Sequence, residues 1–244
     1  MTPDSRLRTP DYFSLPLLKT IPLAQPVFLF TPPFTQLNTP YPATAYLKGF
    51  LNTRNIPAVQ ADFGIDVTLA VFCKKGLTAL FTTIRAANPV YTENGARMMA
   101  MQEEYIRSID EVVAFLQGKQ PTLAHRICSR HFLPEASRFQ QVEDIKWAFG
   151  TMGIQDKAKY LATMYLEDLG DLIKETIDEH FGFSRYAESL GRSAGSFDEL
   201  YTALTTTPGY LDQVLLDLLD KKMQAIHPGM VAISVPFPGN LYTA

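Results

Sequence analysis

Cysteine is scarce in this chain, since Cys73 and Cys128 are the only two among its 244 residues. Two thiols cannot build the disulfide framework of a small secreted domain. Residues 1–6 lack the positive segment and apolar core of a secretion signal. The best candidate for a membrane-spanning helix, residues 65–84, is interrupted by charged side chains. We therefore expect a cytoplasmic protein that makes no membrane contact.

Excess positive charge and phosphate-binding glycines are also missing. The 22 Lys and Arg residues are outnumbered by 25 Asp and Glu residues, and they form no local basic cluster. Nucleic-acid binding needs such a cluster to neutralise phosphates. Neither Gly-x-Gly-x-x-Gly nor Gly-x4-Gly-Lys-Ser/Thr occurs in the sequence. These absences argue against binding of nucleic acid, a dinucleotide or a nucleoside triphosphate.

The first well-patterned segment begins at residue 27. Residues 27–30 are uninterrupted apolar, as expected of a parallel strand covered on both faces. A proline-rich loop and a helix follow, and Pro40 suits the first turn of that helix. Residues 58–62 predict a second strand and residues 65–84 a second helix. This order of strand, helix, strand and helix indicates a parallel sheet with right-handed crossovers.

The pattern then becomes helical as far as residue 226, and a third strand is predicted at 231–235. A crossover between parallel strands needs only about a dozen residues, so we interpret residues 92–226 as an insertion. The predicted fold class is α/β: a Rossmann-like parallel sheet, incomplete at the C-terminus, with a large all-helical insertion. Its predicted parts are an irregular leader (1–26), the first half of the Rossmann-like domain (27–91), the helical insertion (92–226), and the third strand with its loop (227–244).

Loops that leave the carboxyl ends of parallel strands are the usual ligand sites of open α/β sheets. The first such loop, residues 31–41, combines proline and aromatic walls with a few polar anchors, which suits a flat cofactor; the other interpretation is a loop that only closes the top of the sheet. Asp62 after the second strand is either a ligand contact or a helix cap. His125, Cys128 and His131 do not share one helix face, so they predict no metal site. No residue set predicts a catalytic centre.

Two segments carry a resemblance to a known family. Residues 32–47, Pro-Pro-Phe-Thr-Gln-Leu-Asn-Thr-Pro-Tyr-Pro-Ala-Thr-Ala-Tyr-Leu, and residues 233–242, Ile-Ser-Val-Pro-Phe-Pro-Gly-Asn-Leu-Tyr, resemble the N-terminal part of radical S-adenosylmethionine proteins with a cobalamin-binding domain. In detail the resemblance covers residues 25–84 and 228–244, and it covers the helical middle only loosely. It implies a cobalamin-binding-like segment that is not catalytic in isolation.

The resemblance also implies cofactors and a partner. The rest of the same polypeptide would form a radical domain with S-adenosylmethionine and a 4Fe-4S cluster, for methyl transfer or rearrangement. The Asp-x-His-x-x-Gly motif is absent, so a bound cobalamin would lack a lower His ligand, and the Cys-x3-Cys-x2-Cys motif of the cluster is absent as well. The ligand contacts it implies lie in three loops: Pro33, Phe34, Leu37, Asn38 and Thr39; Asp62 and Gly64; Pro236, Phe237, Gly239 and Asn240.

A different function class remains open for the helical insertion. Met98, Met99 and Met101 form a cluster of flexible thioethers, which suit adaptable binding surfaces. On this interpretation the insertion docks a carrier or partner protein, and the sheet is a degenerate scaffold that binds no cofactor. Ordinary core packing is the other explanation of the same methionines.

Overall fold

A small parallel sheet organises one half of the molecule. The structure, a computed structural model, describes residues 25–35, 37, 41–142, 153–183 and 197–244. The central strand β1 (Val27–Thr31) pairs in parallel with β2 (Ala58–Asp62) on one side and with β3 (Met230–Ile233) on the other. Every residue of β1 is buried, as its continuous apolar run predicts for a strand covered on both faces. The protein is thus mixed α/β with three parallel strands among the described residues.

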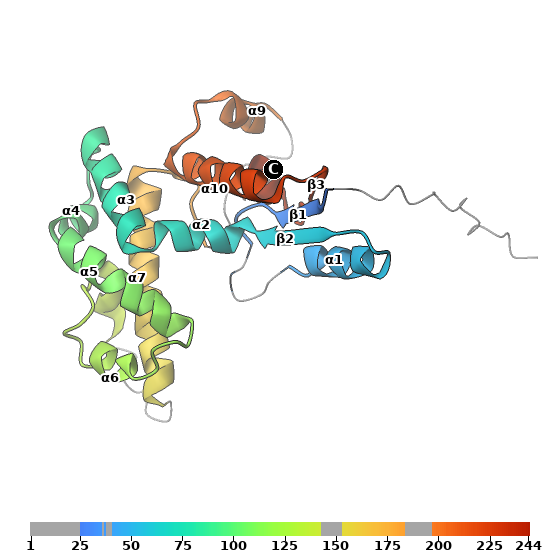
Figure 1. The fold of residues 1–244 in the computed structure, drawn as a ribbon. Helices are drawn as coiled ribbons and strands as arrows, with labels where there is room; N and C mark the ends of the chain where they lie inside the picture. The colour runs from blue at the N-terminus through green and yellow to red at the C-terminus, as the bar shows by residue number, and fades with distance from the viewer. Residues whose placement is uncertain (1–24, 36, 38–40, 143–152, 184–196) are drawn as a thin grey trace, which may run out of the picture.

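Helices cover both faces of this sheet. Phe28 and Phe30 of β1 pack with Phe63 against apolar side chains of α10 (Tyr210–Ile226). Successive side chains of a strand point to opposite faces, so Val27 and Leu29 face away from α10. Figure 1 shows α10 above the strands and α1 (Ala43–Thr53) below them. The α10 helix falls within the range predicted as the insertion, yet it packs on the sheet.

The other half of the molecule is a helical body around the longest helix, α7 (Figure 1). At its centre the rings of Tyr105 and Tyr165 stack with centroids 5.1 Å apart, and the Tyr165 hydroxyl lies 3.0 Å from Ser108 Oγ. Leu161, Tyr165 and Leu169 recur at helical spacing along α7 and are buried. The remaining elements are α2 (Phe63–Val71), α3 (Lys74–Ala87), α4 (Glu93–Ala100), α5 (Gln102–Leu116), α6 (Leu123–Cys128), the 3-10 helix η1 (Ser137–Val142), α7 (Ile154–Thr176), α9 (Asp198–Thr205) and α11 (Pro238–Tyr242).

The prediction of one continuous helix over residues 65–84 is wrong. The segment forms two helices, α2 and α3, whose axes differ by 73°. The Cys73 thiol caps the second helix by accepting the Gly76 N–H at 3.3 Å. At Gly76 a Cβ atom would lie 2.1 Å from the carbonyl oxygen of Ala70, so only glycine permits this close turn. Among the described helices no single one has the length and hydropathy of a membrane span; only α2 and α3 together pass, as a bent pair.

Candidate functional site at the carboxyl edge of the sheet

The loops that follow β1 and β3 meet at the carboxyl edge of the sheet. The Asn240 side chain donates through Nδ2 to the carbonyl oxygen of Pro32 at 2.9 Å. One turn later, the Thr243 hydroxyl donates to the carbonyl oxygen of Pro33 at 2.6 Å. These bonds join positions more than 200 residues apart in sequence. The structure therefore brings the first and third predicted loops together.

The first turn of α2 reaches the same place, because α2 begins at Phe63 directly after β2 and takes the position of the predicted second loop. Gly64 is buried beside the first loop, and a Cβ atom at this position would lie 3.4 Å from the backbone nitrogen of Thr35. Asp62 is the N-cap of α2, since its Oδ1 accepts the N–H groups of Gly64 at 2.9 Å and Ile65 at 3.3 Å. Burial raises the pKa of Asp62, and these two hydrogen bonds act in the opposite direction. The helix-cap interpretation of Asp62 thus matches its geometry.

Five of the eleven predicted contact residues are buried: Pro33, Phe34, Gly64, Gly239 and Asn240. The Phe34 ring packs edge-on against Phe181 with centroids 5.6 Å apart. The Phe34 contact ties the first loop to the segment that follows α7 in the helical body. Asn38 and Thr39 lie outside the described residues.

Asn240 combines complete burial with an incomplete hydrogen-bond set. Its side chain is 0% exposed, and its Oδ1 has no partner among the described residues. A buried amide oxygen without a partner costs about 1–3 kcal/mol, so such atoms in native structures call for an explanation. The Nδ2 bond to Pro32 shows that the side chain is held by the first loop. An acceptor therefore lies within the junction, next to the exposed rim.

The rim of the junction is apolar and exposed. Tyr41 and Phe237 form an edge-to-face ring pair with centroids 5.9 Å apart, and their side chains are 37% and 53% exposed. Leu37 is exposed on the first loop, and Pro236 beside Phe237 is half-buried. Tyr41 and Thr243 were not among the predicted contacts. An aromatic side chain at the far end of the first loop pointed to Tyr41, whereas Thr243 had no signal in the sequence beyond its place one turn after Asn240.

An open groove of about 690 Å³ lies beside this rim, between α2 and the helical body. Leu37 of the first loop belongs to its wall, so the groove adjoins the junction. The lining is mostly apolar and comes from four parts of the chain: Leu37; Ile65, Thr68, Leu69 and Phe72; Val113, Leu116 and Gln117; and Thr163, Leu166, Glu167 and Phe183. Such a lining offers a surface for apolar groups and few hydrogen-bond partners.

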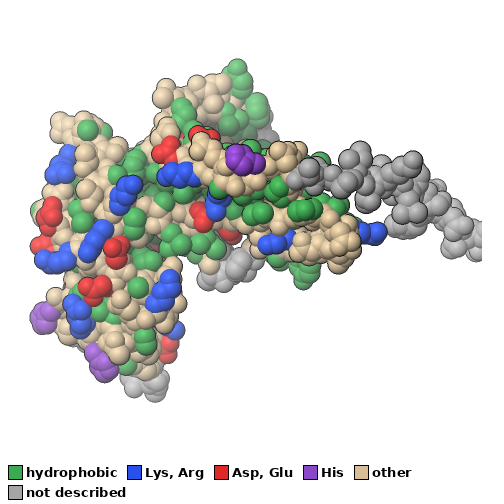
Figure 2. All heavy atoms as spheres, viewed as in Figure 1, with side chains coloured by type: hydrophobic (Ala, Val, Ile, Leu, Met, Phe, Trp, Pro, Cys, Tyr) green, Lys and Arg blue, Asp and Glu red, His purple; other side chains and the backbone are tan. Residues whose placement is uncertain are grey.

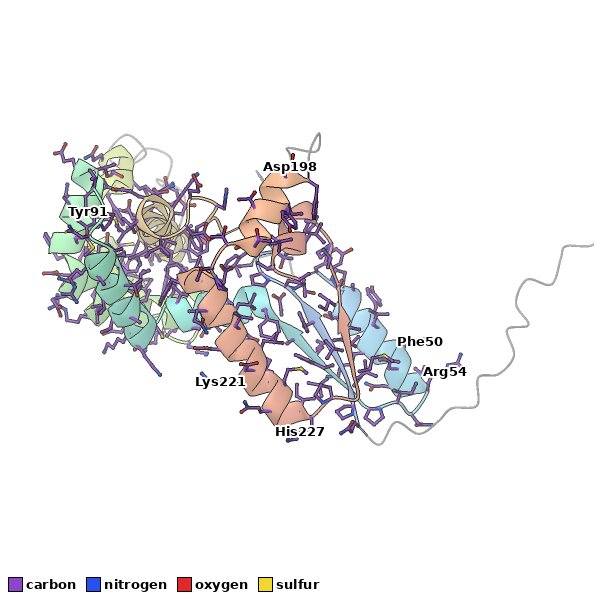
Figure 3. All side chains as sticks on the ribbon, turned by 90° about the horizontal axis from the view of Figure 1, so that it is seen from above. Phe50, Arg54, Tyr91, Asp198, Lys221 and His227 are labelled. Atoms are coloured by element: carbon purple, nitrogen blue, oxygen red, sulfur yellow. The ribbon has the colours of Figure 1, made fainter. Side chains whose placement is uncertain are left out.

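The arrangement of the described side chains does not indicate a metal site. Within the described ranges, no group of three or more His, Cys, Asp or Glu side chains is arranged to hold a metal ion. The four histidines of the sequence are His125, His131, His180 and His227, and none follows a strand at the carboxyl edge. Figure 3 shows His227 at the end of α10, at the opposite end of the sheet from Asp198 of α9. The site therefore offers apolar surface and amide groups.

Comparison with known proteins gave no match. No protein-family model matches the chain, and neither a curated protein nor a solved structure matches it.

Proposed function

We propose that this chain is the cobalamin-binding-like N-terminal segment of a radical S-adenosylmethionine enzyme and contributes a cofactor platform without catalysis of its own. The observation that supports it is the meeting of the loops after β1 and β3 with the first turn of α2 at one edge of the sheet, through Asn240, Thr243 and Gly64. The strand order β2-β1-β3 agrees with a doubly wound sheet whose ligand lies between strands 1 and 3. We infer on this basis a Rossmann-like sheet that is incomplete beyond β3.

The residues divide into two roles in this proposal. Pro33, Phe34, Gly64, Gly239 and Asn240 position the loops, because they are buried in the junction. The exposed apolar rim of Leu37, Tyr41, Pro236 and Phe237 supplies the surface on which the flat corrin ring would lie, with Asn38 and Thr39 on the same loop. Asn240 acts in this proposal by holding the first loop through its Nδ2 bond to Pro32, since its side chain is fully buried.

The remaining chemistry would come from outside these residues. A bound corrinoid would supply a cobalt centre for methyl transfer or rearrangement, and the Asp-x-His-x-x-Gly motif that would supply its lower His ligand is absent from the sequence. The iron–sulfur cluster and S-adenosylmethionine belong in this proposal to the full-length protein, because the two cysteines at positions 73 and 128 cannot hold a cluster.

The alternative, a docking module without cofactor, loses the observation that suggested it. Met98 is 0% exposed in the core of the helical body, and Met99 and Met101 pack against the same core. The three thioethers therefore do not form an exposed, adaptable surface. We accordingly prefer the cofactor platform as the function of this chain.

Titration with hydroxocobalamin tests the proposal. The visible corrin bands should shift on addition of the protein, and Phe237→Ala should weaken binding about tenfold, because the exposed part of the ring contributes about 1.4 kcal/mol when covered. Phe50→Ala is the matched control, since Phe50 is 56% exposed near the C-terminal end of α1, at the end of the sheet away from these loops (Figure 3). The proposal fails if neither the 244-residue chain nor the complete protein shifts the corrin bands. It also fails if the two variants weaken binding equally.

A further inference from the structure

The helix α1 turns its more polar side toward the sheet. Thr44 is buried, and Lys48 and Leu51 on the same face of the helix are half-buried. A helix that covers a sheet normally directs its apolar stripe toward the core. In α1 the larger apolar side chains lie on the exposed side instead: Tyr46, Leu47 and Phe50. These side chains are therefore available for a contact outside the sheet.

The three exposed side chains form one continuous surface, the α1 stripe. Phe50 follows Tyr46 by four residues and Leu47 by three, the two spacings at which helical side chains are neighbours. Tyr46, Leu47 and Phe50 are 77%, 47% and 56% exposed, so the stripe presents about 360 Å² if a large side chain offers about 200 Å². Apolar patches of about 300–600 Å² on a monomer are often functional. Figure 2 shows hydrophobic side chains at the lower border of the molecule beneath α1, whereas charged side chains spread over the α3–α5 side.

The charges around the α1 stripe are few and positive. The helix contains no Asp or Glu, and its single cation, Lys48, lies on the face turned to the sheet. At the C-cap, the Arg54 guanidinium lies 5.4 Å from the centroid of the Phe50 ring (Figure 3). A guanidinium is attracted to the face of an aromatic ring. The Tyr46 ring begins about 12 Å earlier along the axis, so Arg54 stacks on Phe50 and leaves Tyr46 for another cation.

A second copy of α1 in antiparallel orientation fits this stripe. With a two-fold axis beside the middle of the helix, Leu47 of each copy faces Phe50 of the partner subunit. Arg54 of each copy then reaches the end of the helix that carries Tyr46 of the partner subunit. The two guanidinium groups stay at opposite ends of an 11-residue helix, about 16 Å apart, where salt screens most of their repulsion. The stripe is therefore complementary to itself in apolar surface and in charge.

The area of the α1 stripe indicates the strength of such a contact. Two stripes bury roughly 700 Å² together, before the ends of the helices are counted. Stable interfaces bury about 1,200 Å² or more, and weak, reversible contacts lie below this value. We therefore expect an equilibrium between monomer and dimer with a dissociation constant in the micromolar range or above.

We propose that two copies of this chain associate through their α1 stripes as a two-fold, antiparallel pair of helices. The rim residues Tyr41 and Phe237 lie outside the stripe, so this association does not depend on corrinoid binding. Phe50→Ala should weaken the association and leave the hydroxocobalamin titration unchanged, whereas Phe237→Ala should do the reverse.

Sedimentation equilibrium of the 244-residue chain between about 1 and 500 µM tests this association. The weight-average mass should rise toward that of a dimer, and Phe50→Ala should raise the dissociation constant at least about tenfold, since it removes apolar area from both copies. Phe197→Ala is the matched control, because Phe197 is 62% exposed at the start of α9, on the other face of the sheet (Figure 1). A mass that stays monomeric, or equal weakening by the two variants, overturns the proposal. Binding of a monomeric chain to phosphatidylserine vesicles that is lost in Phe50→Ala also overturns it, in favour of a membrane surface.

Two charged variants test the antiparallel orientation. Leu47→Lys and Phe50→Glu each place a charge against an apolar side chain of the partner subunit, so each variant alone should associate at least about tenfold more weakly than the original chain. In a mixture, antiparallel pairing brings the two introduced charges together and keeps one original contact between Leu47 and Phe50. The mixed dimer should therefore be at least about tenfold tighter than either variant alone. A mixture as weak as its components refutes this pairing. Failure of hydroxocobalamin to bind changes none of these results, so the two proposals are tested separately.

Discussion

Asp168 is a buried carboxylate whose charge should reduce the stability of the protein. It lies on α7, is 0% exposed, and its Oδ1 accepts the backbone N–H of Arg138 at 3.2 Å. Its Oδ2 is buried with no hydrogen-bond partner among the described residues. The nearby Arg138 guanidinium is already engaged by Asp171, at 2.7 and 2.9 Å, and by Glu167, at 2.9 Å. Burial, together with the negative charge of Asp171, therefore raises the pKa of Asp168 from 3.8 to about 6.

The sign of the pH dependence follows from this raised pKa. The folded state holds the Asp168 proton more tightly than the unfolded state, so ionisation of this group lowers the free energy of unfolding as the pH rises. The full loss is about 3 kcal/mol, and it develops between about pH 4 and pH 7, because one pKa unit corresponds to 1.36 kcal/mol. Between pH 4.5 and pH 8 the expected loss is about 2 kcal/mol.

The variant Asp168→Asn isolates this contribution, because asparagine keeps the acceptor for the Arg138 N–H and cannot ionise. Relative to the original protein, its free energy of unfolding should increase by about 2 kcal/mol between pH 4.5 and pH 8. Urea denaturation at the two pH values measures the difference. Asp171→Asn is the comparison, since it replaces one of the two oxygens that accept from Arg138 and removes the charge that raises the pKa of Asp168; it should destabilise the protein at pH 8 and reduce the loss between pH 4.5 and pH 8. A difference between Asp168→Asn and the original protein that does not change with pH would refute the argument.

Two further substitutions test the fold and the loop junction. Gly76→Ala should destabilise the protein by several kcal/mol, since its Cβ atom would lie 2.1 Å from the carbonyl oxygen of Ala70. Gly49→Ala has no atom within 4 Å of the new Cβ and should be neutral or stabilising by up to about 1 kcal/mol. Urea denaturation measures both variants, and equal effects would contradict the packing argument. Asn240→Ala should lower the free energy of unfolding by about 1–3 kcal/mol, because it leaves the Pro32 carbonyl oxygen without its hydrogen-bond donor. Asn52→Ala, at an exposed position, is the control. A loss below about 0.5 kcal/mol for Asn240→Ala would contradict the role of this hydrogen bond.

The strands were largely predictable because their signal is local. Residues 27–30 and 58–62 were predicted as strands, and the observed strands are Val27–Thr31 and Ala58–Asp62. The third strand was predicted at 231–235 and observed at Met230–Ile233. The break between α2 and α3 was missed, because apolar spacing continues through it and the close approach of Gly76 to Ala70 exists only in the folded chain.

The site was predictable in its location but not in its internal packing. Parallel strands place their carboxyl ends at one edge, so the segments that follow β1, β2 and β3 had to lie near one another. Whether a loop side chain is exposed depends on contacts from distant segments. Phe34 was predicted as a ligand wall, yet it packs against Phe181 of the helical body. No local pattern links these two rings, which are far apart in the sequence.

The loop junction is connected to α10 through α11. Asn240 and Thr243, on and directly after this helix, hold the first loop through Pro32 and Pro33. Tyr242 of the same helix contacts Asp212 of α10. These three hydrogen bonds come from one short segment directly after the rim residue Phe237, so α11 ties the first loop and the rim to α10. A substitution that displaces α11 should therefore disturb the first loop and the rim of the platform together.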